Sequence, residues 1–167
     1  DKVNAEIGSD YKLFNYYGAA DAEHVIVAMG SACDTIQETV DYLNAKGEKV
    51  GVLEVHLYRP LSAKYCFDVM PKTVEKIAVL DRTKEPGSLG EPLYLDICNL
   101  YKDCDKAPMI IGGRFGLGSK DTTPTQLVAV FDNLDAADCK EEFTIGINDD
   151  VTNLSLALGE RVNAAPA

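Results

Sequence analysis

Features that mark membrane and exported proteins are missing from this sequence. No run comes near the roughly 20 apolar residues that a membrane-spanning helix needs, so we expect no membrane partner. The N-terminus, Asp1-Lys-Val-Asn-Ala-Glu6, lacks the basic and then apolar pattern of a signal peptide. An initiator methionine is also absent, and we expect the chain to begin inside a longer protein.

Metal-binding and disulfide motifs are missing as well. The five cysteines are an odd number, they are widely spaced, and no C-x-x-C pair occurs. This pattern argues against a disulfide framework, a zinc site and an iron–sulfur cluster, and a reducing cytoplasm is the expected location. Only two histidines are present, and Asp149-Asp150 lacks the D-x-D-x-D-G register of a calcium loop, so we expect a solvated turn there. We predict no metal site.

Positive charge is scarce. The 167 residues include 16 Lys and Arg against 27 Asp and Glu, which gives a net charge of −11. Patches of Lys and Arg are what binds nucleic-acid phosphates, so we predict no nucleic-acid partner, and the acidic balance fits a role in solubility. The hydrophobic content of 46% is that of an ordinary globular protein. The length suits one domain that buries about 70% of its unfolded surface.

The sequence does have a regular alternation of short apolar runs and helical patterns. The apolar runs predict strands at 25–29, 50–57, 76–80, 108–111 and 143–147. The patterns between them predict helices at 34–45, 62–70, 92–101 and 124–134, with Ile36, Val40 and Leu43 on one face of the first. Such alternation is typical of βαβ units, so we predict an α/β fold with three layers, α/β/α, around a mostly parallel sheet. In the predicted helix 92–101, we expect Leu95, Cys98 and Tyr94 to point inward.

The first predicted strand, 11–17, breaks this rhythm. Only seven residues, 18–24, separate it from the next strand. A parallel crossover needs a dozen or more residues, so this strand should run antiparallel to the others. We assign residues 1–150 to the domain. Residues 151–167 show no clear period until 162, and we expect them to form a linker or tail.

A glycine-rich run, Gly113-Arg-Phe-Gly-Leu-Gly-Ser-Lys120, nearly matches the phosphate-binding loop G-x-x-x-x-G-K-[S/T]. Its last two residues are in reverse order, which misplaces both the lysine for the phosphates and the hydroxyl for magnesium. The next helix also begins only near Thr123, which is late for a phosphate. We therefore favour a tight turn in which Arg114 and Lys120 pair with carboxylates, including those of a neighbouring domain. The candidate anion-binding or interdomain residues are Arg59, Gly113, Arg114, Gly118, Ser119 and Lys120.

Two further positions have both a structural and a functional interpretation. Gly30-Ser-Ala-Cys-Asp34 opens a helix after a strand, the usual phosphate position of a dinucleotide fold, but G-x-G-x-x-G is absent. We favour Ser31 or Asp34 as helix caps. His56 ends a strand, and we favour a structural hydrogen-bonding role over that of a general base. No G-x-S-x-G marks a nucleophile, and we name no catalytic residue.

Several runs together resemble one family. They are Tyr11-Lys-Leu-Phe-Asn-Tyr-Tyr-Gly18, Val27-Ala-Met-Gly-Ser31, Val55-His-Leu-Tyr-Arg-Pro-Leu-Ser62, Leu80–Pro92, Gly112–Pro124 and Phe143–Thr152. In order and spacing they are similar to the second domain of pyruvate:ferredoxin (flavodoxin) oxidoreductase, which resembles the transketolase C-terminal domain. The resemblance implies a mixed sheet whose first strand is antiparallel. It also implies a parent enzyme, expected to be a homodimer in an anaerobic cytoplasm, that decarboxylates pyruvate oxidatively, forms acetyl-CoA and reduces ferredoxin or flavodoxin.

That parent enzyme uses thiamine diphosphate, Mg²⁺, [4Fe-4S] clusters and coenzyme A, whose motifs are absent here. The sequence has neither a G-D-G motif with a downstream Asn nor a C-x-x-C-x-x-C run. The resemblance therefore implies a scaffold between other domains, inactive alone and without a cofactor of its own. Two alternatives stay open. One is a stand-alone module that binds an anion or coenzyme A, and the other is a piece of a related 2-oxoacid oxidoreductase or a transketolase-like enzyme.

Overall fold

The computed structural model describes residues 2–148 and 151–159. Six strands form one sheet: β1 (Phe14–Gly18), β2 (His24–Ala28), β3 (Val50–Val55), β4 (Lys76–Asp81), β5 (Met109–Arg114) and β6 (Glu142–Thr144). The helices are α1 (Lys2–Ile7), α2 (Ala32–Asn44), α3 (Ala63–Val69), α4 (Pro92–Tyr101) and α5 (Pro124–Asp135), with a short 3₁₀ helix at Leu117–Ser119. None of the described helices is long and apolar enough to cross a membrane.

The strand order is β1-β3-β2-β4-β5-β6, and only β1 runs antiparallel to its neighbour. The predicted mixed sheet with an antiparallel first strand is therefore confirmed. β1 approaches β3 closely where Gly18 lies opposite Gly51. A Cβ on Gly18 would come within 2.6 Å of the backbone of both Gly51 and Val50, so this contact requires glycine. The strand itself begins at Phe14, three residues later than predicted.

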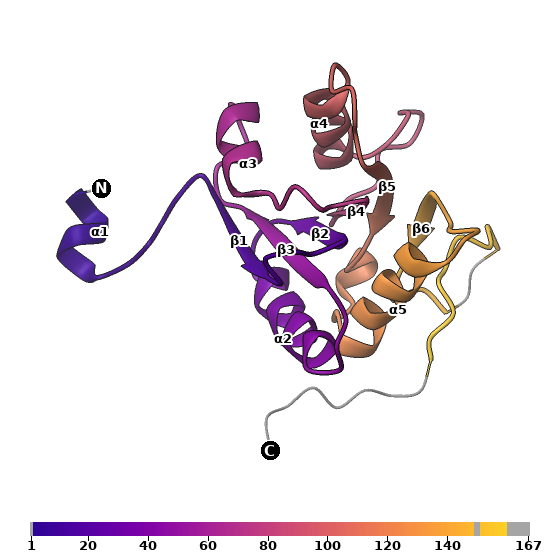
Figure 1. The fold of residues 1–167 in the computed structure, drawn as a ribbon. Coiled ribbons are helices and arrows are strands. Elements are labelled where there is room, and N and C mark those ends of the chain that lie inside the picture. Colours follow the sequence, from indigo (N-terminus) through magenta and orange to yellow (C-terminus); the bar gives the residue numbers. More distant parts are fainter. Residues whose placement is uncertain (1, 149–150, 160–167) are drawn as a thin grey trace.

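Helices cover both faces of the sheet, as the three-layer prediction required (Figure 1). The face with α2 and α5 buries one apolar cluster, which includes the predicted inward residues Ile36, Val40 and Leu43 of α2. The face with α3 and α4 buries a second cluster. The sequence favours a helix at α2 because its apolar residues recur every three or four positions. They form one apolar stripe that packs on the sheet, and the polar residues on the opposite side of the helix face water.

The connection through α5 differs in hand from the other crossovers. The helices α2 and α5 lie on the same face of the sheet. The connection from β2 to β3 moves toward the β1 edge of the sheet, whereas the connection from β5 to β6 moves toward the opposite edge. Since the connections through α3 and α4 agree with the one through α2, the one through α5 is the exception to the usual uniform hand. The loop after β5 must therefore cross to the α2 side of the sheet before α5 begins. This crossing decides which residues meet at the carboxyl edge.

Two local predictions were wrong. β5 does not end at Ile111 but runs through Gly112 and Gly113 to Arg114. These glycines allow close packing in a strand: a Cβ on Gly113 would lie 2.3 Å from Cζ of Phe143. In α4 the buried residues are Leu93, Ile97 and Tyr101, whereas Leu95 is exposed and Cys98 and Tyr94 are half-buried. The bounds of α4 match the prediction, but its buried face is rotated because Leu93 follows the start of the helix directly.

The described segments at the two sides of the layered body differ in their contacts with it. α1 has no buried residue and stands apart from the sheet in Figure 1. Residues 151–156 follow β6: Thr144 N–H donates to Leu154 O, and Leu156 N–H donates to Thr144 O, both at 3.0 Å. The division into residues 1–150 and 151–167 stays a prediction. Asp149-Asp150 and residues 160–167 lie outside the described residues.

Candidate functional site

Three loops meet at the carboxyl edge of the sheet, after β2, β4 and β5. β2 continues to β3 on one side and β4 continues to β5 on the other, so the strand order reverses between β2 and β4. In open α/β sheets, the crevice at such a reversal is the usual place for a ligand. Here the loops surround a pocket of about 400 Å³. Its polar lining consists of Ser31, Thr35, Arg82, Lys120, Asp121 and Thr122.

Arg82 is the pocket cation that sequence reasoning missed. It directly follows the last residue of β4, and its side chain lies over Gly116 of the next loop. A Cβ on Gly116 would lie 2.8 Å from Nε of the exposed Arg82 side chain, which can move aside, so it is the backbone φ of 61° that requires glycine. The signal was available: a cation at the carboxyl end of a strand lies at the same edge as the loops of the neighbouring parallel strands.

Lys120 reaches this pocket through a sharply turned loop. Gly116, Gly118 and Ser119 all have left-handed backbone angles, with φ values of 61°, 64° and 58°. The predicted tight, glycine-enabled turn is therefore present from 116 to 119. It leaves Lys120 near the start of α2, while Gly118 and Ser119 shape the turn and do not line the pocket.

α5 satisfies its own first turn, which argues against a phosphate-binding loop of the usual kind. The helix begins at Pro124, as the sequence predicted, and Thr123 caps it. Gln126 N–H donates to Thr123 Oγ1 at 3.4 Å, and Thr123 N–H donates to Gln126 Oε1 at 3.0 Å. This capping box occupies amide groups that a phosphate would otherwise use.

Arg114 and Gly113 belong to the sheet, away from the pocket. Arg114 is 6% exposed, and its guanidinium donates to Oε1 of Glu91 and Oε1 of Glu142, both at 2.5 Å. Glu91 is itself buried at the start of α4, whereas the Glu142 side chain is largely exposed at β6. The carboxylate partners of Arg114 therefore come from this chain, and they join α4, β5 and β6.

Arg59 lies on a different part of the surface from Lys120. Its Nε is 3.0 Å from Oδ2 of Asp96 on α4, and its guanidinium lies 4.6 Å from the centre of the Tyr58 ring. The α4 face is opposite to that of α2 and α5. The structure thus separates the candidates into three places: Lys120 in the pocket, Arg114 in a buried ion pair, and Arg59 beside α4.

The cap predicted at Ser31 is present by position but not through its side chain. Ser31 is the N-cap of α2 but has helical backbone angles, φ −64° and ψ −17°, and its side chain makes no capping hydrogen bond. Asp34 lies inside the first turn, where a carboxylate favours the positive end of the helix. The Ser31 hydroxyl instead lines the pocket.

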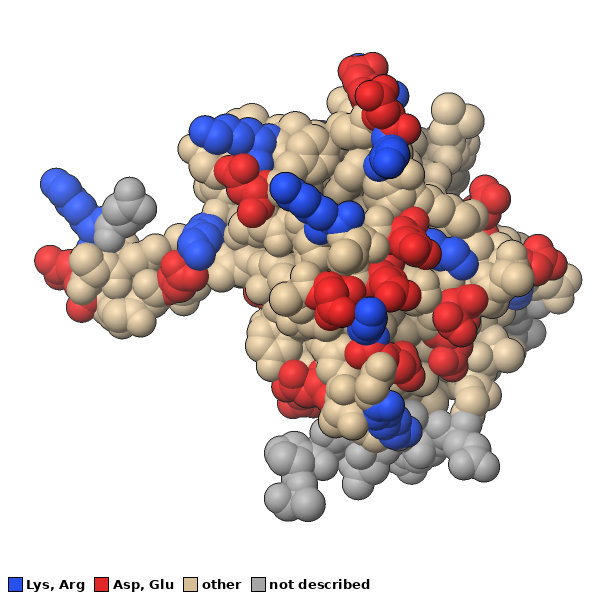
Figure 2. All heavy atoms as spheres, viewed as in Figure 1, with Lys and Arg blue, Asp and Glu red and all other residues tan. Residues whose placement is uncertain are grey.

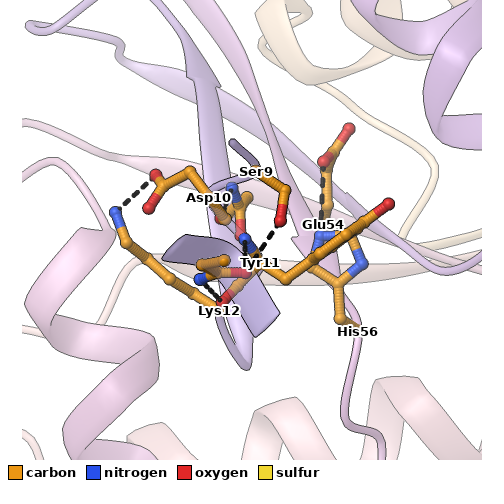
Figure 3. Close-up of polar contacts among 8 residues, drawn as sticks. Ser9, Asp10, Tyr11, Lys12, Glu54 and His56 are labelled. Carbon is orange, nitrogen blue, oxygen red and sulfur yellow. Dashed lines mark hydrogen bonds and ion pairs between the residues drawn. The ribbon is translucent and has the colours of Figure 1, made fainter. Parts of the chain in front are cut away.

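His56 takes part in a polar cluster with the N-terminal segment (Figure 3). Its Nε2 lies 3.6 Å from Oε2 of the buried Glu54, which accepts a hydrogen bond from Gln37 Nε2 at 2.5 Å. The rings of Tyr11 and His56 are nearly perpendicular, with their centres 6.5 Å apart. Asn4 holds Tyr11 in place through hydrogen bonds of 2.9 and 3.1 Å to its backbone. His56 thus has packing and charge contacts, but the hydrogen-bonding role predicted for its side chain stays a prediction, because 3.6 Å is beyond hydrogen-bond distance.

The donor groups of the described residues do not fit a metal or an iron–sulfur cluster. The described residues contain no group of three or more His, Cys, Asp and Glu side chains that could hold a metal ion. Cys33 and Cys66 lie in the two opposite apolar clusters, and burial raises the pKa of each thiol to about 12. All five cysteines are free. Thiolates are what such clusters need, and these buried thiols stay protonated.

Acidic and basic side chains are interspersed on the face shown in Figure 2, where the acidic ones predominate. This face presents no continuous basic patch of the kind that tracks a nucleic-acid backbone. The pair of cations at the carboxyl edge is therefore a local exception in an acidic chain.

Comparison with known proteins gives one family throughout. The model for pyruvate:ferredoxin oxidoreductase core domain II matches residues 22–127, more than half of the chain. A pyruvate-flavodoxin oxidoreductase from Enterobacter agglomerans is 61% identical over 160 residues, which are 96% of this chain and 14% of the relative. A pyruvate:ferredoxin oxidoreductase from Moorella thermoacetica is 53% identical over 166 residues, which are 99% of this chain and 14% of the relative. The chain thus spans about a seventh of the length of these relatives.

Solved structures agree on the fold. A split-gene transketolase, described as an inactive β4 tetramer, has a TM-score of 0.51 at 12% identity, over 74% of this chain and 39% of that one. A 2-oxoglutarate:ferredoxin oxidoreductase from Magnetococcus marinus also has a TM-score of 0.51, at 18% identity, over 77% of this chain and 20% of that one. With the family model and the sequence relatives, these findings show that the chain belongs to the pyruvate:ferredoxin/flavodoxin oxidoreductase family as its transketolase C-terminal-like domain II.

Proposed function

We propose that this chain is a structural, non-catalytic domain of an enzyme that oxidatively decarboxylates pyruvate to acetyl-CoA and passes the electrons to ferredoxin or flavodoxin. The observation that carries the proposal is the full-length likeness to relatives about seven times longer that are named for this reaction. The chain contributes one domain, and the reacting groups belong to the rest of the enzyme. Its direct partners are then the neighbouring domains, in a homodimeric cytoplasmic enzyme.

The chemistry of the described residues supports this division of labour. Arg114 is committed to two carboxylates, and the buried thiols are protonated at neutral pH. No described cluster of side chains offers ligands for a metal ion. Thiamine diphosphate, Mg²⁺ and [4Fe-4S] clusters would therefore be held by other domains, which also present the reacting groups to coenzyme A.

Exposed apolar side chains give the proposed scaffold its contacts. Leu89 is 97% exposed in the long loop between β4 and α4, and Val3 and Ile7 on α1 are 64% and 63% exposed. Single exposed apolar residues are common on protein surfaces. α1, however, stands apart from the packed layers, and Leu89 lies in a loop outside the helices and strands, so a neighbouring domain can cover all three side chains.

The substitution Leu89→Asp tests the scaffold role when it is made both in the isolated chain and in the intact enzyme. In the isolated chain the free energy of unfolding should change by less than about 0.5 kcal/mol, because the side chain contacts little. In the intact enzyme it should lower the melting temperature and the rate of pyruvate oxidation, because a charge would be buried between domains. Ser88→Asp is the matched control, since it adds the same charge at an adjacent exposed residue and removes no apolar group.

Two results would refute the proposal. The first is an intact enzyme in which Leu89→Asp and Ser88→Asp are equally harmless. The second is an isolated chain that oxidises pyruvate by itself.

A further inference from the structure

We propose that the pocket between the loops after β2, β4 and β5 binds a phosphate-bearing small molecule, with Arg82 and Lys120 as its cationic contacts. This goes beyond the structural role and does not depend on it, because a domain can hold a ligand without supplying a reacting group. The argument rests on the two cations, the hydroxyl groups beside them and the shape of the pocket.

Arg82 is an available cation. The described part of the chain contains three arginines, and Arg59 and Arg114 each have a carboxylate partner. Arg82 makes no ion pair with the described residues, and its exposed side chain lies beside Gly116 at the pocket wall. A guanidinium presents a planar fork of N–H donors that matches two phosphate oxygens. An arginine that is positioned but unpaired is what an anion site requires.

Lys120 brings a second charge from a separate loop. β4 and β5 are parallel neighbours in which Asp81 pairs with Arg114, so the chain leaves both strands at the same level. The left-handed residues Gly116, Gly118 and Ser119 then turn the second loop back toward α2. Arg82 and Lys120 thus face one pocket although 38 positions separate them in the sequence. Two cations that line the same pocket repel each other, and an anion bound between them would relieve this repulsion.

Neutral donors complete the site. The hydroxyl of Ser31 is not used to cap α2, and Thr35 and Thr122 add two more hydroxyl groups. The N-terminal end of the 13-residue α2 contributes its partial positive charge. Asp121 is the anionic member of the lining, and its carboxylate can only accept hydrogen bonds. It therefore suits a donor on the body of the ligand rather than the phosphate.

The volume of the pocket points to an organic phosphate. About 400 Å³ lies within the range of small-molecule sites and far exceeds what one inorganic ion fills. A phosphate monoester or diphosphate with a hydroxylated body would use both the cations and Asp121.

The test is a titration of the ¹⁵N-labelled chain followed by amide chemical shifts, at constant ionic strength. The probes are inorganic pyrophosphate and glycerol 3-phosphate, with glycerol as the matched compound that lacks a phosphate. We expect saturable shifts at residues 30–35, 82 and 115–122 with both phosphates and none with glycerol. Arg82→Gln and Lys120→Gln should each raise the dissociation constant about tenfold, the loss expected for one charge-assisted hydrogen bond.

Lys84→Gln is the matched control, because it removes one positive charge from an exposed position two residues from Arg82 and outside the pocket. It should change the dissociation constant less than twofold. Lys120→Arg keeps the charge and should retain binding. Shifts that never saturate, or a loss of affinity with Lys84→Gln equal to that with Arg82→Gln, would overturn the proposal. Failure here leaves the Leu89 comparison untouched, so the two proposals are judged separately.

Discussion

Gly113→Ala is the sharpest test of the packing at the carboxyl half of β5. The new Cβ would lie 2.3 and 2.4 Å from Cζ and Cε2 of Phe143, and 2.7 Å from Cδ2 of Leu80. Both neighbours are fully buried, so neither can move aside freely. Overpacking of this kind costs about 1–3 kcal/mol, and the gain from replacing a strand glycine, about 0.5–1 kcal/mol, offsets only part of it. We expect a net loss of about 1–2 kcal/mol.

Gly112→Ala is the matched control at the adjacent position of the same strand. There the nearest atoms are Cδ2 and Cγ of Tyr94 at 3.2 Å, and Tyr94 is only half-buried, so its ring can shift. Urea unfolding followed by circular dichroism measures both variants, and the control should stay within about 1 kcal/mol of the parent chain. If Gly113→Ala were as stable as the parent, or Gly112→Ala were the more damaging change, the packing argument would fail.

Two further predictions use contrasts within the chain. Arg114→Met should destabilise the fold by about 3–5 kcal/mol, because it leaves the buried carboxylate of Glu91 without a partner. Arg59→Met breaks only an exposed ion pair and should cost less than about 1 kcal/mol. Equal losses of unfolding free energy in urea would contradict this prediction. At pH 8 a thiol reagent should modify the exposed Cys104 rapidly but Cys33 only after denaturant is added, because burial raises the pKa of the Cys33 thiol to about 12. Similar labelling rates of the two thiols in the folded chain would argue against the burial of Cys33.

The layered fold could be predicted from the sequence because its signals are local. The apolar spacing of Ile36, Val40 and Leu43 gave α2, and Pro92 and Pro124 mark the first residues of α4 and α5. The short connection after β1 was enough to predict its antiparallel direction. Each of these inferences needs only neighbouring residues and the geometry of one element.

The misses arose where distant residues decide the local structure. Gly112 and Gly113 look like a turn, but the packing of Phe143 against β5 keeps them in the strand. Arg114 has partners on α4 and β6 that no spacing rule connects to it. Arg82 and Lys120 come together only because the loop after β5 crosses to the α2 face. Such pairings depend on tertiary structure, which periodicity does not encode.

The proposal that this domain supports catalysis elsewhere is tested most directly by one activity measurement. The folded, isolated chain and the intact enzyme are supplied side by side with pyruvate, coenzyme A, thiamine diphosphate, Mg²⁺ and oxidised flavodoxin, and pyruvate-dependent flavodoxin reduction is recorded. A structural domain predicts reduction by the intact enzyme and none by the isolated chain, since the described residues hold no metal-binding group and their buried thiols stay protonated. Pyruvate-dependent reduction by the isolated chain would show that the reacting groups lie within these 167 residues after all.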